Sequence, residues 1–165
     1  MTADSYSIAE GLYRQSMPLP LVLRTDDFRA MLQRIMVALN ALLTGDPQPF
    51  NSLWSHADDV SVLGGFGGFE HGWDRVEHDT RSAASWFTDG HLVGIDLVTL
   101  GASANGDLAF GVWIERALAQ LAGSDAPVPV MVRVTHIFRR EEGTWRLLHR
   151  HGDRSTGAPE IIATL

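Results

Sequence analysis

The amino-acid sequence predicts a single α+β domain, in which helices come first and long antiparallel strands follow. The length of 165 residues fits one domain with a sizeable core. Helical spacing of apolar residues is confined to the region before Gly90, whereas alternation and turn residues dominate after it. This order of elements is typical of α+β proteins and differs from the alternating order of parallel α/β folds.

The first half contains an arm and one well-marked helix. Residues 1–24 are expected to form an N-terminal arm, because Pro18 and Pro20 interrupt any long element there. Thr25 or Asp26 is a suitable N-cap for the helix, and Gly45 is its expected end. The apolar residues of this helix recur at helical spacing: Phe28, Met31, Leu32, Ile35, Leu39 and Leu42.

Shorter elements are expected next. A helical turn over 50–54 and a strand over 59–63 lead to a glycine-rich run at 64–68. This run lacks the flanking residues of a phosphate-binding loop, so we interpret it as a flexible turn. A second helix is predicted over 73–87, with Gly90 as its end.

The second half reads as four long strands joined by turns. They are predicted over 92–100, 108–117, 128–140 and 145–151. Counting outward from the Glu142-Gly143 turn gives the expected partners Arg140 with Trp145, Phe138 with Leu147, and His136 with His149. Apolar residues fall on both faces of these strands, which predicts a second cover besides the helices. We therefore expect a homodimer packed sheet to sheet.

The composition excludes several kinds of chemistry. The chain has no cysteine, so thiol nucleophiles and thiolate metal ligands are excluded. All 13 basic residues are arginine, which excludes a lysine nucleophile. The net charge of −7 argues against nucleic-acid binding. Neither a membrane-spanning apolar segment nor a secretory signal is evident, so we expect a cytoplasmic protein with no membrane partner.

The stretch 133–153, RVTHIFRREEGTWRLLHRHGD, resembles the SnoaL-like proteins of the nuclear-transport-factor-like superfamily, which includes ketosteroid isomerases. It is also similar to the association domain of calmodulin-dependent kinase. By element order the resemblance covers about residues 26–155 and implies a SnoaL-like domain over 25–155, followed by a C-terminal tail over 156–165. The implied fold is a cone-shaped, cystatin-like roll of long helices packed on a bent antiparallel sheet around a cavity.

The kinase resemblance further implies that Arg133 and His149 reach the cavity. Simple alternation places these two residues on opposite faces of the sheet. A bulge would reconcile the two expectations.

Candidate catalytic residues come from the strands. Glu115 stands in an apolar strand, and Arg133 is its expected partner on the next strand, where the pair would either orient a polar substrate or brace the sheet. His149, His151 and Asp153 share one face at alternate positions. They would form a hydrogen-bonded network able to act as acid and base, or bind a divalent metal. We assign neither a metal nor a cofactor to the site.

An aromatic rim is the candidate ligand-binding feature. Its members are Trp54, Phe66, Phe69, His71 and Trp73, which would surround a small apolar or planar ligand. The alternative interpretation is that the tryptophans fill the core.

Two functions remain open from the sequence. The first is a pocket protein that binds a small, largely apolar ligand and catalyses cofactor-independent proton transfer, of isomerase, dehydratase or cyclase type. Its base would be Glu115 or a member of the His149, His151 and Asp153 group, with Arg133 stabilising the developing negative charge. The second is a non-catalytic ligand-binding or dimeric association domain.

Overall fold

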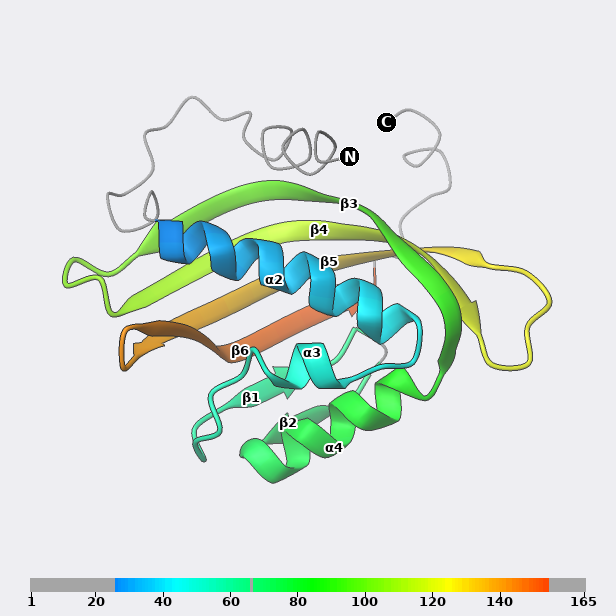
Figure 1. Ribbon diagram of the computed structural model, residues 1–165, viewed down its shortest axis with the longest axis horizontal. Coiled ribbons are helices and arrows are strands. Elements are labelled where there is room, and N and C mark those ends of the chain that lie inside the picture. Colours follow the sequence, from blue (N-terminus) through cyan, green and yellow to red (C-terminus); the bar gives the residue numbers. More distant parts are fainter. Residues whose placement is uncertain (1–25, 66, 155–165) are drawn as a thin grey trace.

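Helix α2 (Asp26–Leu43) begins the part of the chain that the structure, a computed structural model, describes: residues 26–65 and 67–154 (Figure 1). Helices α3 (Gln48–Asn51) and α4 (Trp73–Ala84) follow. The six strands of the described residues are β1 (Ser61–Leu63), β2 (Phe69–His71), β3 (Phe87–Ala102), β4 (Leu108–Leu121), β5 (Val128–Glu141) and β6 (Thr144–Arg154).

All six strands form one sheet in the order β2-β1-β6-β5-β4-β3. The pairs β1–β2, β3–β4, β4–β5 and β5–β6 are antiparallel. Strand β1, however, runs parallel to β6, and the chain between these two neighbouring strands contains β2, α4 and strands β3 to β5. The sheet is therefore mixed, whereas the sequence predicted a purely antiparallel one.

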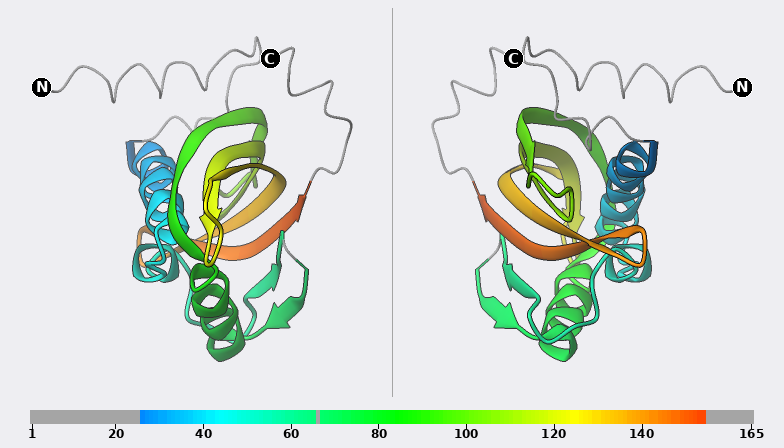
Figure 2. Two further views of the ribbon diagram at one scale, coloured as in Figure 1. Left: turned by 90° about the vertical axis from the view of Figure 1, so that its right-hand side faces the viewer. Right: turned by 90° about the vertical axis from the view of Figure 1, so that its left-hand side faces the viewer.

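The long strands curl into an incomplete roll (Figure 2). Strand β3 has three register shifts against β4, near Asp89, Gly94 and Thr99. Such bulges bend a strand and increase its twist, which accounts for the curl. Helix α2 contacts β3 and β6, the first and last strands of the curled part, and so covers its open side.

The core lies between α2 and the concave face of the sheet, called the inner face from here on. Phe28 of α2 packs edge-on against Phe138 and Trp145, with ring centroids 5.7 and 5.3 Å apart. On β4, every odd-numbered side chain from 109 to 119 is buried, as alternation requires of a strand with one face on the core.

The first helix and the four late strands are confirmed, although β3 begins five residues before its expected start and β4 ends four residues after its expected end. The second helix is wrong at its end, since α4 stops at Ala84 and Phe87 already begins β3. The described helices have 18, 4 and 12 residues, so the expectation of long helices is not confirmed. The predicted arm, the C-terminal tail and Phe66 lie outside the described residues. Within those residues, no helix is long and apolar enough to cross a membrane.

Gly90 has a different role from the helix end that the sequence suggested. It lies inside β3, where a Cβ atom would come within 2.8 Å of the Leu118 carbonyl oxygen and 3.1 Å of the Leu43 carbonyl oxygen. Both obstacles are backbone atoms, so they cannot move aside as a flexible side chain would. The glycine therefore permits the end of α2 to approach the sheet closely.

We predict that Gly90→Ala lowers the free energy of unfolding by about 1–3 kcal/mol, the usual effect of overpacking. Gly94→Ala is the matched control in the same strand, because the nearest atom to its Cβ would be the Arg116 side chain at 3.4 Å. Its effect should stay within about 0.5 kcal/mol. Urea unfolding of both variants measures the difference, and equal stabilities would contradict the close-approach explanation.

Candidate functional site

Three charged or polar side chains meet inside the roll, one from each of three adjacent strands. Glu115 of β4 and His136 of β5 are buried, with 5% and 0% of their surfaces exposed, and Arg150 of β6 joins them. The Arg150 Nη1 and Nη2 atoms donate to Glu115 Oε1 and Oε2, at 2.8 and 2.7 Å. Arg150 Nη1 also lies 2.8 Å from His136 Nε2. We call these three residues the buried polar cluster.

Aromatic rings enclose the buried polar cluster. Trp113 Nε1 donates to Glu115 Oε1 at 3.1 Å, and the Trp113 ring meets the His136 ring edge-on at 4.8 Å. The Arg150 guanidinium lies 5.7 Å from the centre of the Phe50 ring. Removing one member of a buried ion pair commonly costs about 3–5 kcal/mol, because the other charge is left without compensation. Each of the two charges, on Glu115 and on Arg150, can therefore stay buried only because the other compensates it.

A bulge in β6 explains why Arg150 faces inward. Phe138 pairs with Leu147, but the next pair is Ile137 with His149, so Leu148 has no partner across the strand pair. After this extra residue, the even-numbered side chains of β6 point inward, whereas the odd-numbered ones do so before it. The expected pair of His136 with His149 is therefore wrong, and the partner of His136 is Arg150.

The expected pair of Glu115 with Arg133 is also wrong. Glu115 lies opposite Val132, and Arg133 lies opposite Ile114. The difference is a single residue in register, and one residue moves a side chain to the other face of the sheet.

The contact with Arg150 fixes the protonation of His136. An arginine side chain only donates hydrogen bonds, so Nε2 must accept and the proton of the neutral ring must be on Nδ1. Burial, followed by the nearby charges of Arg150 and His149, lowers the pKa of His136 well below its ordinary value. His136 is thus a neutral ring, and its Nδ1 is buried with no hydrogen-bond partner among the described residues.

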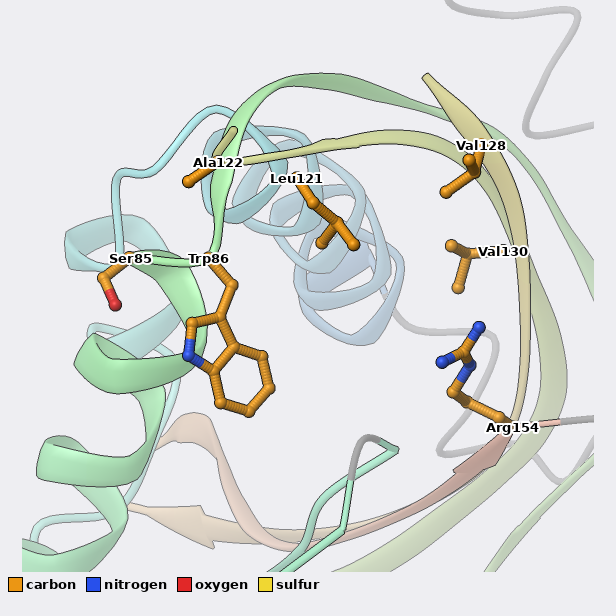
Figure 3. A pocket seen from close by; sticks show the side chains of 7 residues that line it. All are labelled: Ser85, Trp86, Leu121, Ala122, Val128, Val130 and Arg154. Carbon is orange, nitrogen blue, oxygen red and sulfur yellow. The ribbon is translucent and has the colours of Figure 1, made fainter. Parts of the chain in front are cut away.

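A pocket opens at the end of the roll where β4 turns into β5 (Figure 3). Its volume is about 320 Å³. Its walls are Ser85 and Trp86 before β3, Leu121 and Ala122 at the end of β4, Val128 and Val130 of β5, and Arg154 of β6. The Trp86 carbonyl accepts a hydrogen bond from the Ala122 N–H at 2.8 Å, which joins two of these walls.

A family model described as a SnoaL-like domain matches residues 29–153, which span the roll, the cluster and the helices around them. The chain belongs to the SnoaL-like domain family. No curated protein matches it.

Solved structures share the fold of this SnoaL-like domain. A proposed dehydratase of the NTF2-like family from Streptomyces avermitilis is 22% identical, with a TM-score of 0.61, over 80% of this chain and 97% of that one. A proposed calcium/calmodulin-dependent protein kinase II association domain from Thiobacillus denitrificans is 19% identical, with a TM-score of 0.61, over 84% and 96%. A ketosteroid isomerase-like protein from Erwinia carotovora is 12% identical, with a TM-score of 0.62, over 81% and 99%.

The other candidate catalytic residues lie on the outer face of the SnoaL-like domain. Arg133 forms an exposed ion pair with Asp153, with Nε 2.9 Å from Oδ1. His149 Nδ1 lies 2.9 Å from the Ser61 hydroxyl, and His151 is exposed. The bulge therefore does bring Arg133 and His149 to one face, but this face is opposite to the cavity side that the resemblance implied. No three His, Asp or Glu side chains of the described residues are placed to hold a metal ion.

The predicted aromatic rim does not form a single group in the described residues. Trp54 is a fully buried core residue, while Phe69 is 72% exposed. Trp73 stacks on His56 with ring centroids 3.9 Å apart, and His71 is exposed at the end of β2. For Trp54 the alternative interpretation is therefore correct, since this tryptophan fills the core.

Sequence reasoning found Glu115 but missed Arg150, Trp86 and Arg154. Arg150 follows Leu147-Leu148, and strict alternation from Trp145 places it on the outer face. No residue type marks the bulge that reverses this. Trp86 was assigned to a helix, and Arg154 lies beyond the expected end of the last strand.

We predict that His136 is neutral, with its proton on Nδ1, at pH 6.5, where an unperturbed histidine would be half protonated. The pKa of an unperturbed histidine is about 6.5, so the unfolded chain binds a proton below that pH while folded His136 does not. His136 should therefore reduce stability as the pH falls below about 6.5. Side-chain ¹⁵N spectra, assigned by comparison with His136→Gln, report the tautomer directly. An imidazolium signal from His136 near pH 6.5 would overturn this assignment.

Proposed function

We propose that this SnoaL-like domain binds a small, largely apolar ligand inside its roll, with a polar group of the ligand at the buried polar cluster. The observation that carries the proposal is the buried Nδ1–H of His136, a hydrogen-bond donor with no partner among the described residues. A buried donor left without an acceptor is costly, and a ligand carbonyl oxygen would satisfy it.

The inward positions of the sheet between the pocket and the cluster are apolar. Ala117 and Ala119 of β4, Val132 and Val134 of β5, and Gly152 of β6 occupy the inward positions between the two. Arg154 at the pocket and Arg150 in the cluster are four residues apart, or about 13 Å along a strand. A ligand of this length would contact apolar walls along its body and meet polar groups at its inner end.

The cluster also has the groups that proton transfer requires. Glu115 is the buried carboxylate of the described residues, and it would accept a proton from a carbon next to the ligand carbonyl. The His136 Nδ1–H would donate to the carbonyl oxygen as negative charge develops there. Returning the proton to another carbon would complete an isomerisation, and loss of a leaving group would complete an elimination. The fold shared with a proposed dehydratase and a ketosteroid isomerase-like protein supports this class of reaction.

We predict that the protein accelerates exchange of the α-protons of cyclic ketones for deuterium in D₂O. With 1-indanone and 2-tetralone as probes, Glu115→Gln should slow the exchange at least about 100-fold, the usual contribution of a general base. Asp153→Asn is the matched control, because it makes the same change in the exposed ion pair of the outer face. Proton NMR follows the exchange, and circular dichroism checks that both variants fold. Equal rates for wild type and Glu115→Gln would contradict a catalytic role for Glu115.

An association domain is the second candidate function, and a separate observation favours it. The outer face carries exposed apolar side chains on two neighbouring strands: Val93 and Val98 of β3, and Leu108 and Phe110 of β4. Phe110 is 42% exposed, and its ring lies over Gly101 of β3. A second copy of the chain, packed sheet to sheet, would cover these residues.

We predict that the protein is a dimer in solution and that Phe110→Asp dissociates it. The introduced carboxylate would be buried in the interface and would face its symmetry mate. Val37→Asp is the matched control, because Val37 of α2 is 66% exposed and lies away from the sheet. Analytical ultracentrifugation gives the mass of each variant. A monomeric wild type, or a dimeric Phe110→Asp, would contradict an interface at this face.

A further inference from the structure

We infer that Asn105, in the turn between β3 and β4, is a site of spontaneous deamidation, where an aspartyl or isoaspartyl carboxylate replaces the side-chain amide. This modification goes beyond the proposed ligand binding and the proposed dimer, since it needs neither. Asn105 is exposed and is followed by Gly106, and the groups around its amide are placed to assist the reaction.

The reaction is an attack of the Gly106 backbone nitrogen on the side-chain carbonyl carbon of Asn105. The nitrogen loses its proton to solvent and bonds to Cγ. The bond from Cγ to Nδ2 breaks, and Nδ2 takes up a proton from solvent and leaves as ammonia, so that a five-membered succinimide remains. Water then opens the ring at either of its carbonyl carbons, which gives aspartate or isoaspartate at position 105. Both products carry one more negative charge than the amide.

Gly106 leaves its backbone nitrogen accessible for this attack. It has a φ of +77°, and it carries no side chain that would shield the nitrogen. The Gly106 N–H donates to the Ser103 carbonyl oxygen at 3.0 Å, and this bond must open before the nitrogen can react. Opening a single backbone hydrogen bond in a surface turn slows a reaction by about tenfold at most.

Two neighbouring residues polarise and orient the Asn105 amide. Ser103 Oγ donates to Asn105 Oδ1 at 2.6 Å, and the Asp107 N–H donates to the same oxygen at 3.4 Å. Negative charge develops on this oxygen when Cγ is attacked, so donors at this position stabilise the transition state. Asn105 Nδ2, the leaving group, donates to Asp107 Oδ2 at 2.8 Å, which holds the amide in one orientation.

The fold protects the two other asparagines of the chain. Asn40 lies inside α2, and its Oδ1 atom accepts a hydrogen bond from the Leu92 N–H at 2.8 Å. Asn51 is only 4% exposed, and the N–H of the following residue, Ser52, is bonded inside a helical turn. Asn105 is therefore the asparagine that should react first.

The product loosens the end of the β3–β4 hairpin. A carboxylate at position 105 would face the Asp107 carboxylate where Nδ2 now donates, so repulsion replaces a hydrogen bond. An isoaspartyl residue also adds one carbon atom to the main chain, which lengthens the turn that the Ser103–Gly106 bond closes. The Asp107 carbonyl oxygen accepts from the Arg140 N–H, so a change in the turn would reach β5.

The test incubates the purified protein at pH 8 and locates isoaspartate by peptide mapping with mass spectrometry and by methyl transfer from an isoaspartyl carboxyl methyltransferase. Asn105 should react at least tenfold faster than Asn40 or Asn51. Its rate should also lie within about tenfold of its own rate in the chain unfolded by urea. Asn105→Gln should remove most of the methyl acceptance, because its amide is one methylene too far away to form the five-membered ring. Asn40→Gln is the matched control and should leave methyl acceptance unchanged.

Three results would overturn the inference. Conversion of Asn105 more than about tenfold slower in the folded than in the unfolded chain would show that the fold protects the turn. Methyl acceptance at the wild-type level in Asn105→Gln would place the modified residue elsewhere. Hydrogen exchange of the aged protein tests the loosened hairpin, since amides over 103–108 should exchange faster than in fresh protein while those of α2 should not. Unchanged exchange over 103–108 in converted protein is the third contrary result.

Discussion

The extra residue in β6, Leu148, determines which side chains the interior of this protein contains. Before it, Trp145 and Leu147 face the core as simple alternation requires. After it, Arg150 takes the inward position that His149 would otherwise hold. A bulge thus directs a cation into the roll and a histidine out of it, without any change of residue type along the strand. The charge inside the roll follows from this one local irregularity.

A buried arginine is stable only if groups on the neighbouring strands neutralise its charge and accept its hydrogen bonds. Glu115 on β4 accepts two hydrogen bonds from it, and His136 on β5 accepts a third. Isolated ions are very costly to bury, so these three positions depend on one another across three strands. The same dependence fixes the tautomer of His136 and leaves its second nitrogen, Nδ1, as a donor. A structural requirement for charge neutrality therefore creates the polar group that the proposed ligand would meet.

The sequence predicted the elements far better than the faces of the strands. Helix α2 and the hairpin at Glu142-Gly143 have strong local signals, namely apolar periodicity and turn residues, and both are confirmed. Glu115 could be recognised because a carboxylate stood in an apolar strand. Its partner could not be recognised, because register depends on the exact length of the β4–β5 connection and on the bulge at Leu148. The sequence placed Gly90 at a helix end because a glycine can equally mark the end of a helix or a close approach of two backbones inside a sheet.

The glycine run between β1 and β2 illustrates the same ambiguity inside the proposed site. Gly65 lies against Val132 and Gly152, and a Cβ atom on Gly65 would come within 3.0 Å of the Val132 side chain. Val132 and Gly152 belong to the inner face between the pocket and the buried polar cluster. A side chain at position 65 would therefore crowd the inner face between Arg154 and Arg150. Gly65 thus allows the loop backbone to pack directly against Val132 and Gly152, which is a packing role rather than a phosphate-binding one.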